Sequence, residues 1–255
     1  MGQAYKRAMT LRLPLTAAVA ATAVLALCLP AVAEELRVRP KAVVELFTSQ
    51  GCAQCPPADA LLTSLADEQD VVALAYHVDY WDYAGWTDTF GSPEFSDRQR
   101  DYAKSWNSSR IYTPQMVING AKDVVGSRRS EVHGAIDGAS LPLSLELALV
   151  GDSNMLKVTI PPDPSLEDAM VWLVTYRDRA DVSIDTGENA GKSMVYTQVV
   201  TGRQLLGMWE AATGAEHKLP LTELLDDGEA GIAILVQQEQ ASLPGPILGA
   251  AAFEP

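Results

Sequence analysis

Two cysteines three residues apart carry the clearest chemistry in this sequence. Cys52 and Cys55 are followed at once by Pro56 and Pro57, and the third cysteine, Cys28, lies in an apolar N-terminal run. A disulfide across so short a loop constrains the unfolded chain very little, so stability is a weak reason to keep the pair. The spacing therefore favours redox chemistry or metal binding.

The position of the pair predicts how a thiol there is activated. Ala42–Thr48 is a short apolar run typical of a strand, and leucines at helical spacing predict a helix over Ala58–Glu68. Unpaired backbone N–H groups and the positive end of the helix dipole favour a thiolate, lowering a cysteine pKa from about 8.5 to roughly 3.5–7.5. We therefore expect Cys52 to attack a partner and Cys55 to resolve the mixed disulfide.

The remaining elements follow from periodicity and turn signals. Strands are expected over Val71–Asp79 and Gln115–Ile118, helices over Ser96–Trp106 and Glu131–Asp137, and a hairpin turn at Asn119-Gly120. After residue 141 the pattern changes to short strands, over residues 143–150, 155–160, 169–177, 182–185, 192–201 and 231–238. The sequence thus predicts an α/β domain over 42–140, followed by a β-rich, sandwich-like domain over 141–255.

Several of these segments resemble known proteins. VVELFTSQGCAQC and YTPQMVING resemble the redox strand and the cis-proline segment of thioredoxin-fold proteins. GCAQCPPADALL, YHVDYWDYAGW, FSDRQRDYA and GENAGK together resemble a secreted bacterial family of unknown function with a thioredoxin-like fold. The resemblance implies a thioredoxin-like α/β domain over 42–140, a cis bond before Pro114 and a place for Thr113 in the site. Gly51 stands where thioredoxins carry tryptophan, and residues 80–107 are an insertion.

Two further side chains have alternative interpretations. The resemblance implies that Glu45 is a buried carboxylate shuttling protons for Cys55; the alternative is a half-exposed strand glutamate. His77 stands near the end of the second expected strand, where it joins Cys52 and Cys55 in a copper or zinc site or packs on a helix. Zinc normally takes a second cysteine pair, which this chain lacks, so we expect no cofactor.

Three other stretches carry residue patterns with a structural or a functional interpretation. The aromatic segment Tyr80–Trp86 is either a docking rim beside the cysteines or a small satellite core. Arg98 and Arg100 are expected on a solvated helix face. The segment Gly187–Ser193 lacks the glycine spacing of a phosphate loop. We therefore interpret it as a loop of the β-rich domain that is able to face the α/β domain with the cysteines.

Residues 1–33 are typical of a secretory signal peptide. Basic residues at 6, 7 and 12 precede the apolar run Leu13–Leu29, and Ala31-Val32-Ala33 is a cleavage pattern. The alternative is an uncleaved anchor, because the apolar run is long. Cleavage leaves a polar lead-in over 34–41 and predicts a periplasmic or secreted protein.

Charge narrows the choice of partners. The chain carries 33 acidic and 19 basic residues, a formal net charge of −14. Such a surface repels phosphate backbones and anionic lipid, so we expect no nucleic-acid partner and no stable membrane association after cleavage. The sequence therefore favours an exported thiol–disulfide oxidoreductase whose partners are protein or small-molecule thiols and disulfides. The alternative function is copper or zinc binding and delivery through the same cysteines with His77.

Overall fold

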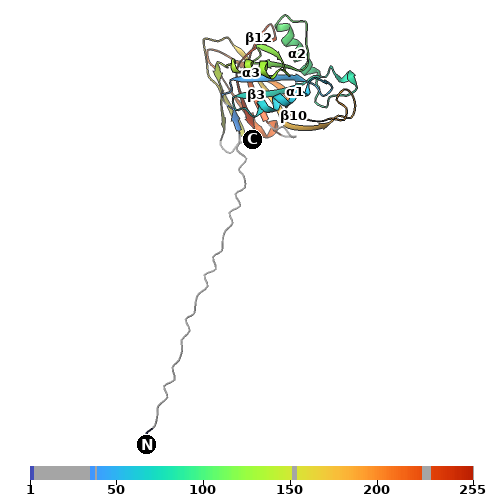
Figure 1. Ribbon diagram of the computed structural model, residues 1–255. Coiled ribbons are helices and arrows are strands. Elements are labelled where there is room, and N and C mark those ends of the chain that lie inside the picture. Colours follow the sequence, from blue (N-terminus) through green and yellow to red (C-terminus); the bar gives the residue numbers. More distant parts are fainter. Residues whose placement is uncertain (3–34, 38, 151–153, 226–230, 255) are drawn as a thin grey trace. The chain divides into compact units, whose positions relative to one another are not determined.

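The computed structural model describes residues 1–2, 35–37, 39–150, 154–225 and 231–254 (Figure 1). From residue 3 onward the expected signal segment, with Cys28, lies outside the described residues. Within the described ranges, no helix has the length and apolar character needed to cross a membrane.

The strands form one large mixed sheet and one small sheet. The large sheet contains β1 (Glu35–Arg37), β2 (Ala42–Thr48), β3 (Val71–His77), β4 (Gln115–Ile118), β5 (Lys122–Val125), β6 (Leu143–Ser144), β9 (Ala169–Ser183), β10 (Ser193–Trp209), β12 (Gly231–Gln240) and β13 (Leu243–Glu254). Its order is β1-β13-β12-β9-β10-β3-β2-β4-β5, and β6 pairs with β13. The small sheet has the order β11-β8-β7, from strands β7 (Glu146–Leu149), β8 (Met155–Ile160) and β11 (Ala215–Pro220).

The helices begin where the sequence supplies suitable end residues. They are α1 (Pro56–Ala66), the short 3₁₀ helix η1 (Asp82–Ala84), α2 (Pro93–Ser105), α3 (Arg129–Asp137) and α4 (Leu221–Leu224). The hydroxyl of Ser92 accepts a hydrogen bond from the backbone N–H of Glu94, which caps α2, and Pro93 fills the first helical position. In α1 two prolines occupy the first turn directly after Cys55.

Local predictions of strand and helix are largely confirmed. β2, β4 and β8 have the predicted bounds, and α1, α2 and α3 differ from the predicted helices by only a few residues at their ends. Asn119 and Gly120 both have positive φ, at 49° and 64°, as the hairpin turn between β4 and β5 requires. The sequence analysis missed β1, β11 and β13, and it divided β9 into two strands.

The expected fold class, a thioredoxin-like α/β domain followed by a separate β-rich, sandwich-like domain, is wrong. The described chain is mostly β, and strands from its second half continue the sheet that β2–β5 begin. β10 pairs in parallel with β3 through Val199 and Ala75, and the backbone N–H of Ile247 on β13 donates to the carbonyl of Asn119. The physical reason is burial: every residue of β2 and β3 is buried, so neither face of these strands is left to solvent.

Three apolar clusters account for this burial. The first lies between α1, α3 and one face of β2–β4. The second lies on the opposite face of β2 and β3, where Phe47 and Tyr76 pack with Tyr176 and Leu235 from β9 and β12. The third joins the small sheet to the far face of β9, β12 and β13 around Trp209. The second cluster therefore unites residues from both halves of the chain in one core.

This shared core predicts cooperative unfolding. Replacing fully buried Leu235 with alanine is expected to lower the free energy of unfolding by about 2–5 kcal/mol, because the deleted methyl groups leave a cavity. Urea unfolding followed by tryptophan fluorescence and by circular dichroism should give one coincident transition in both proteins.

The matched control is Leu149→Ala, at an exposed leucine, which is expected to change the stability by no more than about 0.5 kcal/mol. Two separate transitions, of which only one moves in Leu235→Ala, would contradict a single cooperative core.

Candidate functional site

Cys52 and Cys55 are joined by a disulfide at the start of α1. Cys55 is the residue directly before the helix, and tight turns hold the pair, since the backbone N–H of Cys55 donates to the carbonyl of Cys52 at 3.2 Å. The two cysteines are only 1% and 0% exposed, whereas Ala53 and Gln54 between them are exposed. The disulfide thus lies directly beneath the surface, covered by neighbouring residues.

Trp81 forms one part of this cover and connects the cysteine loop to the proline segment. A Cβ added at Gly51 would lie 3.2 Å from both Cβ and the carbonyl oxygen of Trp81, so the two residues are in close contact. The indole Nε1–H of Trp81 donates to the hydroxyl of Thr113 at 2.7 Å. The Thr113–Pro114 peptide is cis, as expected. The structure therefore joins Thr113 and Pro114 to the cysteine loop through one tryptophan.

Asn189, in the loop between β9 and β10, forms the other part of the cover. Its side chain is 1% exposed and its Nδ2 donates to the carbonyls of Gln50, at 2.8 Å, and Cys52, at 3.0 Å. Lys192 Nζ donates to Asn189 Oδ1 at 2.7 Å, which orients the amide. The loop thus faces the cysteine pair, as the sequence analysis expected.

The aromatic segment over residues 80–86 is held by hydrogen bonds to buried glutamine side chains. Gln50 is fully buried and accepts a hydrogen bond from Trp86 Nε1 at 2.8 Å. The hydroxyl of Tyr80 donates to Gln99 at 3.0 Å. Tyr83 differs from its neighbours, because 84% of its surface is exposed. The segment is a hydrogen-bonded cap over the cysteine loop, with one aromatic ring left in solvent.

His77 is fully buried, and its side chain pairs with Asp88. The His77 ring donates from Nδ1 to Asp88 Oδ2 at 2.8 Å, and the same oxygen accepts the backbone N–H of Gln50 at 2.7 Å. Burial raises the pKa of Asp88, but the charge and hydrogen bond of His77 and two backbone N–H groups outweigh it and hold this pKa below its ordinary value. Among the residues that the structure describes, no three His, Cys, Asp or Glu side chains gather where they could hold a metal ion.

Asp59 is a buried acid beside this cluster that the sequence analysis missed. It lies in the first turn of α1, its Oδ1 accepts the hydroxyl of Thr48 at 2.7 Å, and its Oδ2 is buried without a partner in the described chain. Burial raises the pKa of Asp59 to about 7, against the opposing effects of Thr48 and His77. Its helical spacing from Leu62 and Ala66, on the buried face, is the signal that could have found it.

Glu45 is fully buried, but the structure does not bring it to Cys55. Its Oε1 accepts two hydrogen bonds from the Arg98 guanidinium, at 2.6 and 2.9 Å, and its Oε2 accepts the hydroxyl of Tyr102. Val44 and Leu46 pack under α1, so strand alternation directs Glu45 to the opposite face, against α2. The expectation of a solvated Arg98 is wrong, because this arginine is 8% exposed and pairs with Glu45.

The raised pKa of Asp59 predicts a pH-dependent stability. Between its unfolded value, 3.8, and its folded value, about 7, the native state keeps a proton that the unfolded state has lost. Stability therefore falls by about 1.4 kcal/mol for each pH unit across this window, and the loss is complete above it. The Asp59→Asn variant cannot ionise, so its stability relative to wild type is expected to rise from about pH 4 to about pH 7.

Urea unfolding at several pH values measures this difference, and Asp67→Asn, at an exposed aspartate at the other end of α1, is the matched control. A constant difference between Asp59→Asn and wild type across the window would show that Asp59 is ionised in the folded protein.

Comparison with known proteins places the chain in a family. No curated protein gives a significant match. A crystal structure of a protein from Agrobacterium tumefaciens, a structural-genomics target, is similar, with a TM-score of 0.75 and 34% identity over 85% of this chain and 95% of that chain. HBP35 of Porphyromonas gingivalis shares the fold alone, with a TM-score of 0.56 and 12% identity over 84% of this chain and 74% of that chain. The family described as a protein of unknown function, DUF1223, matches residues 43–237, and this chain belongs to that family.

Proposed function

We propose that this protein is a thiol–disulfide oxidoreductase that works through Cys52 and Cys55. The observation that carries the proposal is the disulfide between them at the N-terminus of α1. Trp81 ties the cis Thr113–Pro114 segment to the cysteine loop. The cysteine and proline motifs also resemble those of thioredoxin-like oxidoreductases, which supports an exchange role for the pair.

In the oxidising direction, the Cys52–Cys55 disulfide accepts electrons from a substrate dithiol. A thiolate of a substrate dithiol attacks Sγ of Cys52, the Cys52–Cys55 bond breaks, and Cys55 leaves as a thiolate with the bonding electron pair. The second substrate thiolate then attacks the substrate sulfur of the mixed disulfide and releases Cys52. Two electrons pass from the substrate, which becomes a disulfide, to the cysteine pair. The reverse sequence reduces a substrate disulfide, with Cys52 attacking and Cys55 resolving.

The N-terminus of α1 supports this chemistry. A thiolate at Cys52 or Cys55 lies at the positive dipole end of the helix. Pro56 and Pro57 have no N–H. The N–H groups of Ala58 and Asp59 donate to the Cys55 carbonyl, so the dipole is the contribution of the helix. It stabilises the thiolate relative to the thiol and so favours Cys55 as a leaving group. On this proposal the partners are thiols or disulfides of other molecules in an oxidising, exported location.

Access to the pair requires movement of its cover. The two cysteines are almost fully buried, and Trp81 and Asn189 contact the loop that carries them. Tyr83, in the segment over 80–86, is largely exposed. We infer that displacement of the segment over 80–89 or of the loop over 186–191 precedes attack on Cys52.

The proposal predicts reversible exchange. In a glutathione series the wild-type pair is expected to pass between disulfide and dithiol, and the reduced protein should accelerate the reduction of insulin. Cys52→Ser is expected to abolish turnover, whereas Cys55→Ser should retain attack and accumulate a mixed disulfide. Cys28→Ser, which removes the third cysteine, is the matched control and should behave as wild type. The opposite result would refute the function: the pair in the folded protein would resist both reduction and oxidation, although the pair in the unfolded protein exchanges freely.

The cover predicts a second, kinetic result. Asn189→Ala removes two buried hydrogen bonds to the cysteine loop, each worth about 1 kcal/mol, so reduction by dithiothreitol should accelerate by about tenfold or more. The matched control is Glu188→Ala, at the exposed neighbour in the same loop, which should leave the rate unchanged. Equal rates in wild type and Asn189→Ala would show that this loop does not limit access.

A further inference from the structure

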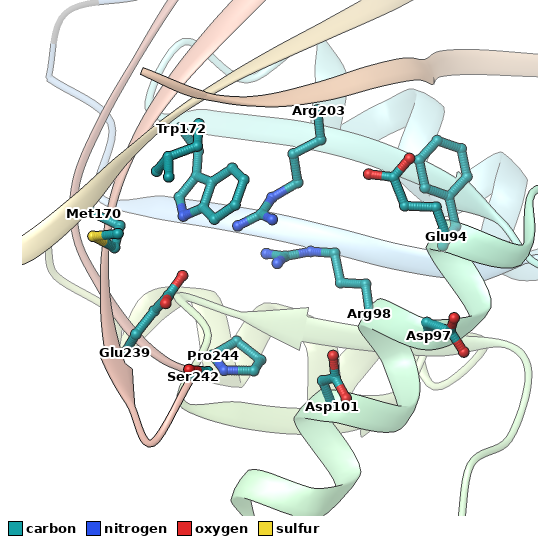
Figure 2. A pocket seen from close by; sticks show the side chains of 12 residues that line it. Glu94, Asp97, Arg98, Asp101, Met170, Trp172, Arg203, Glu239, Ser242 and Pro244 are labelled. Carbon is teal, nitrogen blue, oxygen red and sulfur yellow. The ribbon is translucent and has the colours of Figure 1, made fainter. Parts of the chain in front are cut away.

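A cavity of about 350 Å³ lies away from the residues that surround the disulfide. Residues of α2, β9, β10 and the β12–β13 hairpin line it, and none of the residues that cover the cysteines is among them (Figure 2). Two arginines, Arg98 from α2 and Arg203 from β10, direct their guanidinium groups toward one another inside it (Figure 2). The cavity therefore brings two guanidinium groups together, in a lining that also includes carboxylates.

The two arginines differ in how their charge is balanced. Arg98 pairs with buried Glu45 at 2.6 Å, whereas Arg203 forms no ion pair with any residue that the structure describes. Burial lowers the pKa of Arg203 to about 10, and the nearby charge of Arg98 adds to this effect. The Arg203 side chain is partly buried, its Nε is fully enclosed, and its guanidinium stacks on Trp172 without a carboxylate partner in the described chain. A partly desolvated cation of this kind is stabilised by a bound anion.

Two hydrogen-bond donors of the cavity wall also lack an acceptor in the described chain. Nε of Arg203 and Nε1 of Trp172, another residue of the cavity wall, are both buried and have no partner within the described chain. The guanidinium carbon of Arg203 lies 3.2 Å from the centre of the Trp172 ring, so the two groups form one site. Both atoms are donors only, and native proteins rarely leave such donors unpaired. The missing component is an acceptor.

The walls and the mouth limit the chemistry of that acceptor. Met170, Leu205 and Pro244 supply apolar surface beside the arginine. Four acidic residues also line the cavity (Figure 2): Glu94 and Glu239, which are exposed, and Asp97 and Asp101, which form ion pairs with Arg100 and Lys104. These carboxylates repel a multiply charged anion more strongly than a singly charged one. The planar fork of an arginine matches a carboxylate, which brings one charge and two acceptor oxygens.

We propose that this cavity binds a small monocarboxylate with an apolar tail. The ligand carboxylate accepts hydrogen bonds from Arg203 and supplies a negative charge. Its tail packs on Met170, Leu205 and Pro244. The proposal is independent of the thiol–disulfide function, because no cysteine lines the cavity.

Calorimetric titration of the full-length protein tests this proposal, with acetate, isovalerate and benzoate as probes and inorganic phosphate for comparison. Isovalerate or benzoate should bind one-to-one and more tightly than acetate, and phosphate should bind weakest. Arg203→Met keeps the apolar stem but removes the charge and donors, and it should raise the Kd at least tenfold. Arg203→Lys should give an intermediate Kd, because it keeps the charge and loses the fork. Arg179→Met, at an exposed arginine on β9, is the matched control and should bind as wild type does.

Circular dichroism and thermal unfolding check that each variant folds, and the Trp172→Phe variant gives a second measurement should Arg203→Met fail to fold. Trp172→Phe removes one orphan donor and should weaken binding while Arg179→Met does not. Failure of all three carboxylates to bind wild type, unchanged binding in Arg203→Met or Trp172→Phe, or a preference for phosphate would each overturn the proposal. None of these results depends on the redox state of the cysteines.

Discussion

One buried carboxylate, Glu45, connects the parts on which the rest of this structure depends. It accepts hydrogen bonds from Arg98 and Tyr102 on α2, and both of these residues also contact the side-chain amide of Gln237 on β12. The network therefore joins β2, from the first half of the chain, to α2 and to a strand from the second half. Removing one partner of such a buried pair leaves an uncompensated charge, which is far more costly than losing an exposed ion pair.

The segment between β3 and α2 links this network to the cysteine site. The backbone N–H of Ser92 donates to the carbonyl of His77, so α2 begins directly beside the end of β3. The residues between them supply Trp81, which contacts the cysteine loop, and Asp88, which accepts from Gln50 and His77. Because β2 and β3 are parallel, the loops after both strands lie at one edge of the sheet. Sheet topology thus brings the cysteines and their cover together.

α2 contributes residues both to the surroundings of the cysteine site and to the cavity that contains Arg203. Near its first turn it is bound to the segment that covers the disulfide, through the hydrogen bond from Asp79 N to the hydroxyl of Ser96. Two residues later, Arg98 lines the cavity that also contains Arg203. Near the cysteines, Asp59 Oδ2 and His77 Nε2 are buried without a partner in the described chain. At the cavity the same is true of Arg203 Nε and Trp172 Nε1. The cavity differs because it is an open volume lined by a guanidinium without an ion pair in the described chain, and a ligand is proposed there for that reason.

The sequence by itself determined the local structure and located the cysteine pair. Apolar periodicity located β2, α1 and β4, and the cysteine spacing identified Cys52 and Cys55, because these signals depend only on neighbouring residues. Only the tertiary structure decided the strand order of the large sheet, the buried pair of Glu45 with Arg98, and the stacking of Arg203 on Trp172. Each of these depends on residues from distant segments of the chain. Periodicity reports which face of an element is buried, but many apolar strands fit one another equally well. The choice among them is made by packing of the whole core.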